Sequence, residues 1–277
     1  MKSKTKFNVT DKMIRSIVSK HFPGESVNSI EELTEGMFNS AYALWGTGIL
    51  KSGIVLKTSP APGTELLTYE QDILRTETKV YELLKDSPVK IPKILACDFS
   101  HKEIPCDYFF MEHVKGILWK NCLQRISPES RRQLMYELGR SSAVASCENC
   151  LNEIKTPHLV DFDMWAGNIF IDEATCSHIT GIIDFERSFF GDPAADFTSA
   201  MMLFDNVEDE PDFRKGYSEI SNVPFKITDN DRIRMNLYRL YMAVIIFVES
   251  YRYDEDYAEM IKGHLNKNIA HLLEELK

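Results

Sequence analysis

Three polar residues in the second half of the chain have the types and the spacing that phosphoryl transfer requires. Asp163 precedes Asn168 by five positions in a polar, glycine-containing stretch, and Asp184 ends a later apolar run, GIID. One carboxylate of such a set can orient an acceptor hydroxyl and accept its proton. The other oxygen groups are hard ligands that hold Mg²⁺ on phosphates. The set therefore indicates phosphoryl transfer to a hydroxyl.

A short hairpin is the element that would position these residues. The sequence LVDFDMWAGNIFID, residues 159–172, reads as a polar loop that opens into an alternating strand at Ile169. Twelve residues after Asn168, the run GIIDFE reads as a second strand that ends near Asp184. The two strands would carry the three polar side chains to one edge of a cleft.

The first third of the chain has the pattern of an antiparallel sheet. The segments SIEELTEGMFNSAYALW and IVLKTSP read as strands separated by turns. One turn contains Gly36, Phe38 and Asn39, and glycine there would let backbone amides approach phosphate groups. The chain has no G-x-x-x-x-G-K-[ST] sequence, which excludes a P-loop as the phosphate site.

Lys57 ends one of these strands, and the helical pattern that follows offers it a partner. In residues 64–86, Glu77 lies on the apolar stripe of the predicted helix, and Glu70 falls on the same face. A glutamate on a buried face is costly without a cation. We therefore expect Lys57 to pair with Glu77 or with Glu70.

The lobe boundary is expected near Glu112 to Gly116, where the aromatic segment CDYFFMEHVKG loses its strand character. This gives an N-terminal lobe, 1–113, and a C-terminal lobe, 114–277.

Capping residues predict two helices in the second lobe. Ser127 before a proline predicts the start of a helix that runs to about Ala145. Thr228 with an aspartate three residues on predicts a capping box and a long helix.

Composition restricts the partners of the protein. The chain of 277 residues has a net charge of −10, which argues against nucleic acid as a partner. The most apolar stretch, Leu237 to Val248, is too short to span a bilayer and contains Arg239. We therefore expect no membrane partner and a cytoplasmic location.

Cys147 and Cys150 form a C-x-x-C motif. The chain offers no second pair of metal ligands at a suitable spacing, so we expect these cysteines to be reduced thiols and not zinc ligands.

Several segments together resemble the aminoglycoside phosphotransferase and choline kinase family of small-molecule kinases. The segments are LTEGMFNSAYAL, IVLKTSP, TETKVYELLKD, KIPKIL, YFFMEHVKG, LVDFDMWAGNIFID and GIIDFERSFFGDPAADF. Their order covers nearly the whole chain, and the last two are the most specific. The resemblance implies an α+β, bilobal protein-kinase-like fold: an N-terminal antiparallel sheet lobe with one long helix, and a larger, mainly helical C-terminal lobe.

The resemblance also assigns a role to each matched position. It implies that Asp163 orients and deprotonates the acceptor hydroxyl and that Asn168 and Asp184 hold Mg²⁺. It implies that Lys57 binds the α- and β-phosphates of ATP or GTP, and it favours Glu77 over Glu70 as the residue that fixes Lys57.

Further matched positions concern the nucleotide and the loop that follows Asp184. Gly36 and Asn39 are expected to bind the nucleotide through the glycine-containing turn described above. Met111, Glu112 and His113 match the hinge whose backbone groups meet adenine. Asp192 and Asp196 match a G-D-P-x-x-D element, where we expect structural capping.

One position departs from the family pattern, which begins H-x-D. Asp161 stands where the family has a histidine that braces the catalytic loop. If the carboxylates of Asp161 and Asp163 both pointed inward, their repulsion would raise the pKa of one of them. We expect Asp161 to turn away and to bind backbone amides.

The sequence thus predicts a Mg²⁺-dependent kinase that uses ATP or GTP and acts on a hydroxyl of a small molecule. A catalytically silent nucleotide-binding module and a protein kinase are the alternatives. The short segment between Glu186 and PAADF, which leaves no room for an activation loop, argues against a protein kinase. Aminoglycoside-like, choline-like and sugar-like acceptors all stay open, although Glu249, Glu255 and Asp256 lie near aromatic residues and would suit a cation.

Overall fold

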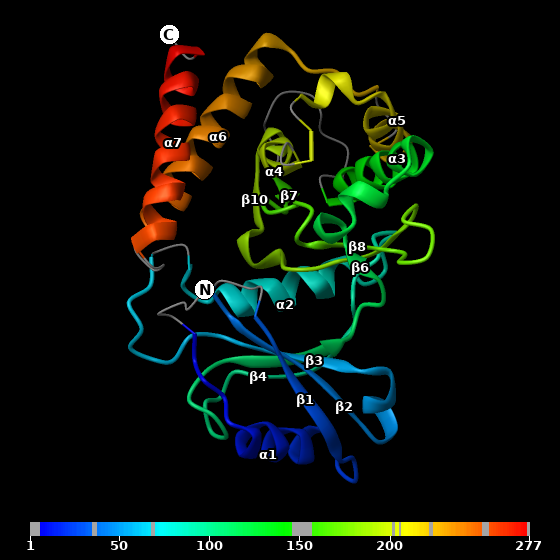
Figure 1. Cartoon of the computed structure of the whole chain (residues 1–277), viewed down its shortest axis with the longest axis vertical. Helices are drawn as coiled ribbons and strands as arrows, with labels where there is room; N and C mark the ends of the chain where they lie inside the picture. The colour runs from blue at the N-terminus through cyan, green and yellow to red at the C-terminus, as the bar shows by residue number, and fades with distance from the viewer. Residues whose placement is uncertain are drawn as a thin grey trace. The chain divides into compact units, whose positions relative to one another are not determined.

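The computed structural model describes residues 6–34, 38–67, 70–145, 157–200, 203–204, 206–221, 224–250 and 255–275. The chain divides into two units (Figure 1). The first unit contains Met1–Leu83 and Pro92–Val114, and the second contains Leu84–Ile91 and Lys115–Lys277. The short segment 84–91 therefore belongs to the second unit, although it precedes the lobe boundary that we expected from the sequence.

A five-stranded sheet forms the centre of the first unit. Its strands are β1 (Val27–Leu33), β2 (Ser40–Gly46), β3 (Ile54–Thr58), β4 (Ile94–Asp98) and β5 (Tyr108–Glu112). They lie in the order β1-β2-β3-β5-β4, and every neighbouring pair is antiparallel. Every residue of the central strand β3 is buried. Its apolar residues Ile54 to Leu56 explain this position, because a central strand needs two apolar faces.

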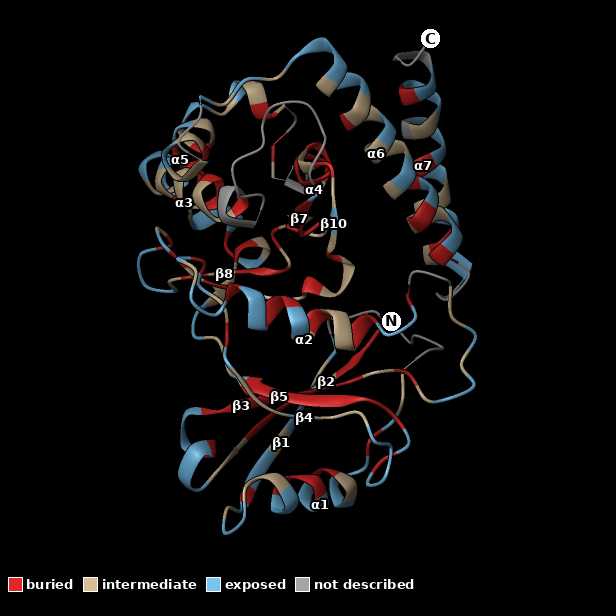
Figure 2. Cartoon of the chain, turned by 180° about the vertical axis from the view of Figure 1, so that it is seen from behind, coloured by how far each residue is buried: buried red, intermediate tan, exposed pale blue. Residues whose placement is uncertain are grey.

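Two helices lie on opposite faces of this sheet, α1 (Asp11–His21) and α2 (Ile73–Leu84) (Figures 1 and 2). The hydroxyl of Thr10 accepts a hydrogen bond from the Met13 amide, 3.3 Å away, and caps α1. Helix α2 begins later than the sequence pattern suggested. Asp72 has a left-handed backbone with φ of 56°, which interrupts the helix just before Ile73.

The second unit consists mainly of helices around short strands. The helices are α3 (Pro128–Ala145), α4 (Asp196–Ala200), α5 (Pro211–Ser221), α6 (Asp229–Glu249) and α7 (Glu255–Glu275). The strands are β6 (Ile117–Leu118), β7 (His158–Val160), β8 (Ile169–Ile171), β9 (Ile179–Ile182) and β10 (Phe189–Gly191). Strands β6, β8 and β9 form one sheet, and β7 pairs with β10.

Glycines allow α3 and α5 to pack closely. A Cβ atom on Gly139 would lie 2.0 Å from the carbonyl oxygen of Phe213, and one on Gly216 would lie 2.0 Å from that of Tyr136. A larger residue at either position would push the helices apart. Figure 2 shows buried residues along the facing sides of these helices.

The helix starts that the sequence predicted are confirmed. Ser127 accepts a hydrogen bond from the Ser130 amide at 3.1 Å, one residue before α3. Thr228 and Asp231 form a reciprocal capping box at the start of α6. That helix ends at Glu249.

Two further findings bear on the sequence predictions. Cys97, Cys106, Cys122 and Cys176 are free thiols, while Cys147 and Cys150 lie outside the described residues. In the described ranges of the chain, every helix is too short or too polar to cross a bilayer.

Candidate active site

The loop between β7 and β8 is held in place by a buried carboxylate. Oδ1 of Asp196 accepts hydrogen bonds from the backbone amides of Asp161, at 2.7 Å, and Phe162, at 3.2 Å. Phe162 has a left-handed backbone with φ of 62°, and its side chain is buried. Such a conformation is unfavourable for a bulky residue and persists only where its surroundings enforce it. Asp196 supplies that constraint.

Aromatic packing fixes the same residue from the other side. The Phe162 ring lies 5.4 Å from the Phe189 ring, 6.4 Å from Tyr238 and 6.0 Å from Tyr241, measured between centroids. The first of these rings comes from β10, and the two tyrosines come from α6. The loop conformation therefore depends on a helix far along the chain.

Asp163 and Asn168 are joined within this loop. Nδ2 of Asn168 donates to the carbonyl oxygen of Asp163 at 2.9 Å and to its carboxylate Oδ2 at 3.1 Å. Backbone hydrogen bonds from Trp165 to Asp163 and from Asn168 to Trp165 form the turn between them. Because the amide nitrogen faces Asp163, the side-chain oxygen of Asn168 is the atom left to bind a cation.

The β8–β9 hairpin brings Asp184 beside Asn168. Ile169 pairs with Ile182 in the two strands, and the Ile183 amide donates to the Asn168 carbonyl at 3.0 Å. Asp184 follows directly and has a left-handed backbone with φ of 71°. Asn168 and Asp184 thus lie close together along the backbone of the hairpin, and an amide oxygen with a carboxylate is a donor set that fits Mg²⁺.

Arg187 and Glu249 form a buried ion pair beside Asp163, and the sequence did not reveal this pair. Nη2 of Arg187 lies 2.8 Å from Oε1 of Glu249, while its Nε lies 4.0 Å from Oδ2 of Asp163. The side chains of Arg187 and Glu249 are 18% and 8% exposed. Glu249 was a candidate contact for a cationic acceptor in the sequence, but here it binds Arg187. The only sequence signal for Arg187 was its position three residues after Asp184.

The electrostatics of the loop favour protonated carboxyls. Burial raises the pKa of Asp163 to about 7, the Asp184 carboxylate acts in the same direction, and Arg187 opposes both. Burial also raises the pKa of Asp196 to about 7. Burial and the carboxylates of Asp196, Asp163 and Asp184 raise the pKa of Asp161 well above its ordinary value.

Asp161 was expected to bind backbone amides. Its carboxyl interacts with the Asp163 backbone amide, which acts to lower its pKa, but neither carboxylate oxygen has a partner at full hydrogen-bond geometry in the part of the chain that the structure describes. The residue is 1% exposed. Asp196 instead binds the loop amides, so its role is wider than the helix capping that we expected. Asp192 does cap, by accepting from the Ala194 amide at 3.0 Å.

In the first unit, Lys57 pairs with Glu77. Nζ of Lys57 lies 2.8 Å from Oε2 of Glu77, and the glutamate side chain is fully buried. The Tyr81 hydroxyl donates to the other carboxylate oxygen of Glu77 at 3.4 Å. Glu70, the other candidate, is also buried and accepts a hydrogen bond from the Leu67 amide at 2.7 Å. The buried Glu77 therefore has the cationic partner that its position on the helix required.

The remaining nucleotide-binding candidates lie around the same sheet. Asn39 is buried just before β2, and Gly36 lies outside the described residues. Met111 and Glu112 end β5, and His113 follows. The Glu112 amide donates to the Lys93 carbonyl at 3.0 Å, and the His113 amide donates to the Gly53 carbonyl at 3.4 Å. The contact of these residues with adenine stays a prediction.

Comparison with known families finds a similarity over one part of the chain. The model of the phosphotransferase enzyme family, APH, matches residues 155–227, which include the whole loop and hairpin described above. The search of curated protein sequences found no match.

Solved structures are similar over almost the whole chain. The GDP complex of wild-type aminoglycoside 2'-phosphotransferase-IIIa is 17% identical with a TM-score of 0.68, covering 95% of this chain and 99% of that one. The streptomycin-ATP-APH(2")-IIa complex is 14% identical with a TM-score of 0.59, covering 88% and 94%. A microcompartment-associated aminopropanol kinase is 14% identical with a TM-score of 0.61, covering 96% and 98%. The protein-kinase-like fold and the family resemblance that the sequence predicted are confirmed.

Proposed function

We propose that this protein transfers the γ-phosphoryl group of ATP or GTP to a hydroxyl of a small molecule. The observation that carries the proposal is the bond from Asn168 to the Asp163 carboxylate, 3.1 Å long, in a loop that also adjoins Asp184. The proposal assigns the base to Asp163 and the two oxygen ligands of the metal to Asn168 and Asp184. The family match over residues 155–227 supports it.

Each side chain then has one task. Asp163 accepts a hydrogen bond from the acceptor hydroxyl, orients its oxygen and takes the proton as the new P–O bond forms. Arg187, held by Glu249, fixes the position of the Asp163 carboxylate by its charge. Lys57, held by Glu77, binds the α- and β-phosphates.

Mg²⁺ is the implied cofactor, and the donor set of the second unit fits it. Asn168 and Asp184 would hold the ion, which would neutralise charge on the phosphates. Similar structures contain GDP and ATP, so both nucleotides are included in the proposal.

The acceptor is proposed as an alcohol of the aminoglycoside, amino-alcohol or sugar class. Similar enzymes are named for aminoglycosides and for aminopropanol, which share an amine beside a hydroxyl. The net charge of −10 suits such cations and disfavours a nucleic acid. Glu249 is engaged by Arg187, so a cationic acceptor would rely on other acidic groups, and Glu255 and Asp256 at the exposed start of α7 are candidates.

The segment after Asp184 argues against a protein acceptor. Residues Phe189–Gly191 form β10, which pairs with β7, and Pro193 follows in a capped turn. This segment is too short to form the activation loop with which protein kinases receive peptides.

The test is a nucleotide-consumption screen with the purified protein. ATP or GTP with Mg²⁺ is supplied together with aminoglycosides, macrolides, amino alcohols or sugars, and product is confirmed as a phosphate monoester by mass spectrometry. We expect one acceptor class to yield a monoester, and the Asp163→Asn variant to yield none above background. Binding of Mg-nucleotide without transfer to any class would favour the silent nucleotide-binding module instead.

A further inference from the structure

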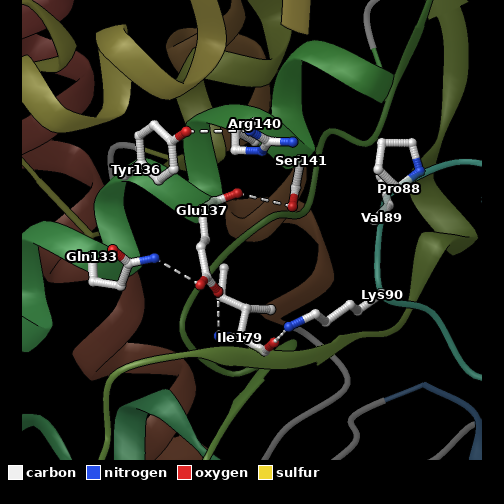
Figure 3. Close-up of a pocket in the computed structure, with 9 residues that line it drawn as sticks. All are labelled: Pro88, Val89, Lys90, Gln133, Tyr136, Glu137, Arg140, Ser141 and Ile179. Carbon is white, nitrogen blue, oxygen red and sulfur yellow. Dashed lines mark hydrogen bonds between the residues drawn. The ribbon is translucent and has the colours of Figure 1, made fainter. Parts of the chain in front are cut away.

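A pocket of about 320 Å³ lies within the second unit and shares no residue with the candidate active site. Three elements enclose it (Figure 3). Residues 88–90 form one wall, one face of α3 forms another, and Ile179 at the start of β9 closes it. The α3 residues that line it are Gln133, Tyr136, Glu137, Arg140 and Ser141. Its volume is at the lower end of the range for small-ligand pockets.

The acidic group of the pocket is already saturated. Oε1 of Glu137 accepts from Nδ1 of His178 at 2.8 Å and from Nε2 of Gln133 at 2.9 Å, and its Oε2 accepts from the Ile179 amide at 2.7 Å. Burial acts to raise the pKa of Glu137, but these hydrogen bonds and the charge of Lys90 lower it below its ordinary value. Glu137 therefore has little capacity left to bind a cationic ligand.

The two cations of the pocket keep unused donors. Lys90 donates to the Ile179 carbonyl at 2.7 Å, which uses one of its three N–H groups. Nη1 of Arg140 contacts the Tyr136 hydroxyl at 3.2 Å and Oε2 of Glu219 at 3.4 Å. Among the described residues, nothing accepts a hydrogen bond from Nη2 or Nε of Arg140. Lys90 and Arg140 can therefore still donate hydrogen bonds to a ligand, whereas Glu137 has little capacity left to accept one.

Apolar residues line one side of the pocket. Figure 3 shows Pro88 and Val89 on the wall opposite Glu137, with Lys90 and Arg140 approaching from different elements. Val89 and Ile179 are buried. A ligand that fits must therefore combine an acceptor-rich, negatively charged group with a small apolar body.

We propose that this pocket binds a small carboxylate or phosphate monoester, with its anionic group between Lys90 and Arg140 and its apolar body against Val89 and Ile179. The segment that carries Lys90 continues directly from α2, the helix of Glu77. A bound anion would tie this segment to α3, at a place that shares no residue with the candidate active site.

The test uses two probes on the intact chain, benzoate and phenyl phosphate, each titrated while ¹H–¹⁵N spectra are recorded. We expect one or both probes to shift the amide signals of Val89, Ser141 and Ile179 in a saturable manner. Saturation by benzoate identifies a carboxylate site, and saturation by phenyl phosphate alone identifies a phosphate monoester site. Signals elsewhere report any binding of phenyl phosphate to a nucleotide site.

Substitutions at the two cations decide whether the binding is specific. Lys90→Met and Arg140→Gln each remove one charge-assisted hydrogen bond, so the affinity of the probe should fall about tenfold. Lys90 is exposed, so its variant is expected to fold even if Arg140→Gln does not. The control is Arg132→Gln, an exposed α3 residue that pairs with Glu129 and does not line the pocket. Absence of shifts at the three amides with both probes, or affinities unchanged in both variants, would overturn the proposal.

Discussion

Asp196 holds the backbone of Asp161 through a hydrogen bond of 2.7 Å, although the two residues are 35 positions apart. The carboxylate that braces the candidate catalytic loop thus comes from α4. The residue at the family's histidine position, Asp161, does not provide this bracing, and its own carboxylate is buried without a partner at full hydrogen-bond geometry among the described residues.

Replacing Asp196 should loosen the loop. Asp196→Ala leaves the amides of Asp161 and Phe162 without their acceptor, and each buried unsatisfied amide costs about 1–3 kcal/mol. We expect lower stability in urea unfolding and lower turnover, with partial rescue in Asp196→Asn, which keeps one acceptor oxygen. The control is Asp172→Ala, in the β8–β9 loop. An Ala variant with the stability and turnover of the wild type would contradict this bracing role.

The buried carboxyl of Asp161 should make stability depend on pH. In the unfolded chain it ionises near 3.8, whereas its pKa in the folded protein is raised by burial. The folded protein therefore keeps a proton that the unfolded chain loses, and stability falls as pH rises above about 4. Asp161→Asn removes this ionisation. We expect the variant to be more stable than the wild type at pH 8 by urea unfolding, with a smaller difference at pH 5. An equal difference at both values would exclude the ionisation as the cause.

The Lys57–Glu77 pair should be more important for nucleotide binding than Glu70. Glu77→Gln leaves a largely buried Lys57 without its carboxylate, which typically costs about 3–5 kcal/mol. We expect the free energy of unfolding and the affinity for Mg-nucleotide, measured by titration calorimetry, both to fall. Glu70→Gln, at a buried glutamate that precedes α2, is the matched control. If Glu70→Gln weakened nucleotide binding more than Glu77→Gln, the assignment of Glu77 would be wrong.

Arg187 and Glu249 should be energetically coupled. Removing either partner leaves a buried charge, whereas removing both does not. In a double-mutant cycle with Arg187→Met and Glu249→Gln, we expect the double variant to be more stable than the sum of the single effects. The exposed pair Arg140–Glu219, with side chains 40% and 41% exposed, is the control and should show a coupling of about 0–1 kcal/mol. Equal coupling in both cycles would show that burial does not strengthen the pair.

Substitutions of Asp163 and Asp184 should affect different steps, turnover in one case and nucleotide binding in the other. Asp163→Ala removes the group that acts on the acceptor, so turnover should fall about 10²- to 10⁴-fold while nucleotide affinity is largely kept. Asp184→Ala removes a metal ligand, so the affinity for Mg-nucleotide should fall. Turnover with the acceptor found in the screen and nucleotide titration separate the two effects. Unchanged transfer in both variants would refute the assignment of the site.

The sequence by itself determined the local features of this protein. The caps at Ser127 and Thr228, the strands of the first sheet and the order of the motifs depend on neighbouring residues, which periodicity and capping chemistry reveal. The spacing of Asp163 and Asn168 was also sufficient to predict that both lie in one loop, because five residues form a single turn there.

Only the tertiary structure decided which side chains support that loop. Asp196 reaches Asp161 over 35 positions, and Arg187 reaches Glu249 over 62. Residues so far apart in the sequence belong to no common helical or strand repeat, so no local pattern could predict these two contacts. The start of α2 at Ile73 likewise could not be predicted from the sequence. Asp72 has a left-handed backbone, which an aspartate can adopt but does not require. The sequence thus specified the residues that can perform the chemistry, whereas long-range packing set their conformation and charge, since both depend on contacts that form only when distant segments come together.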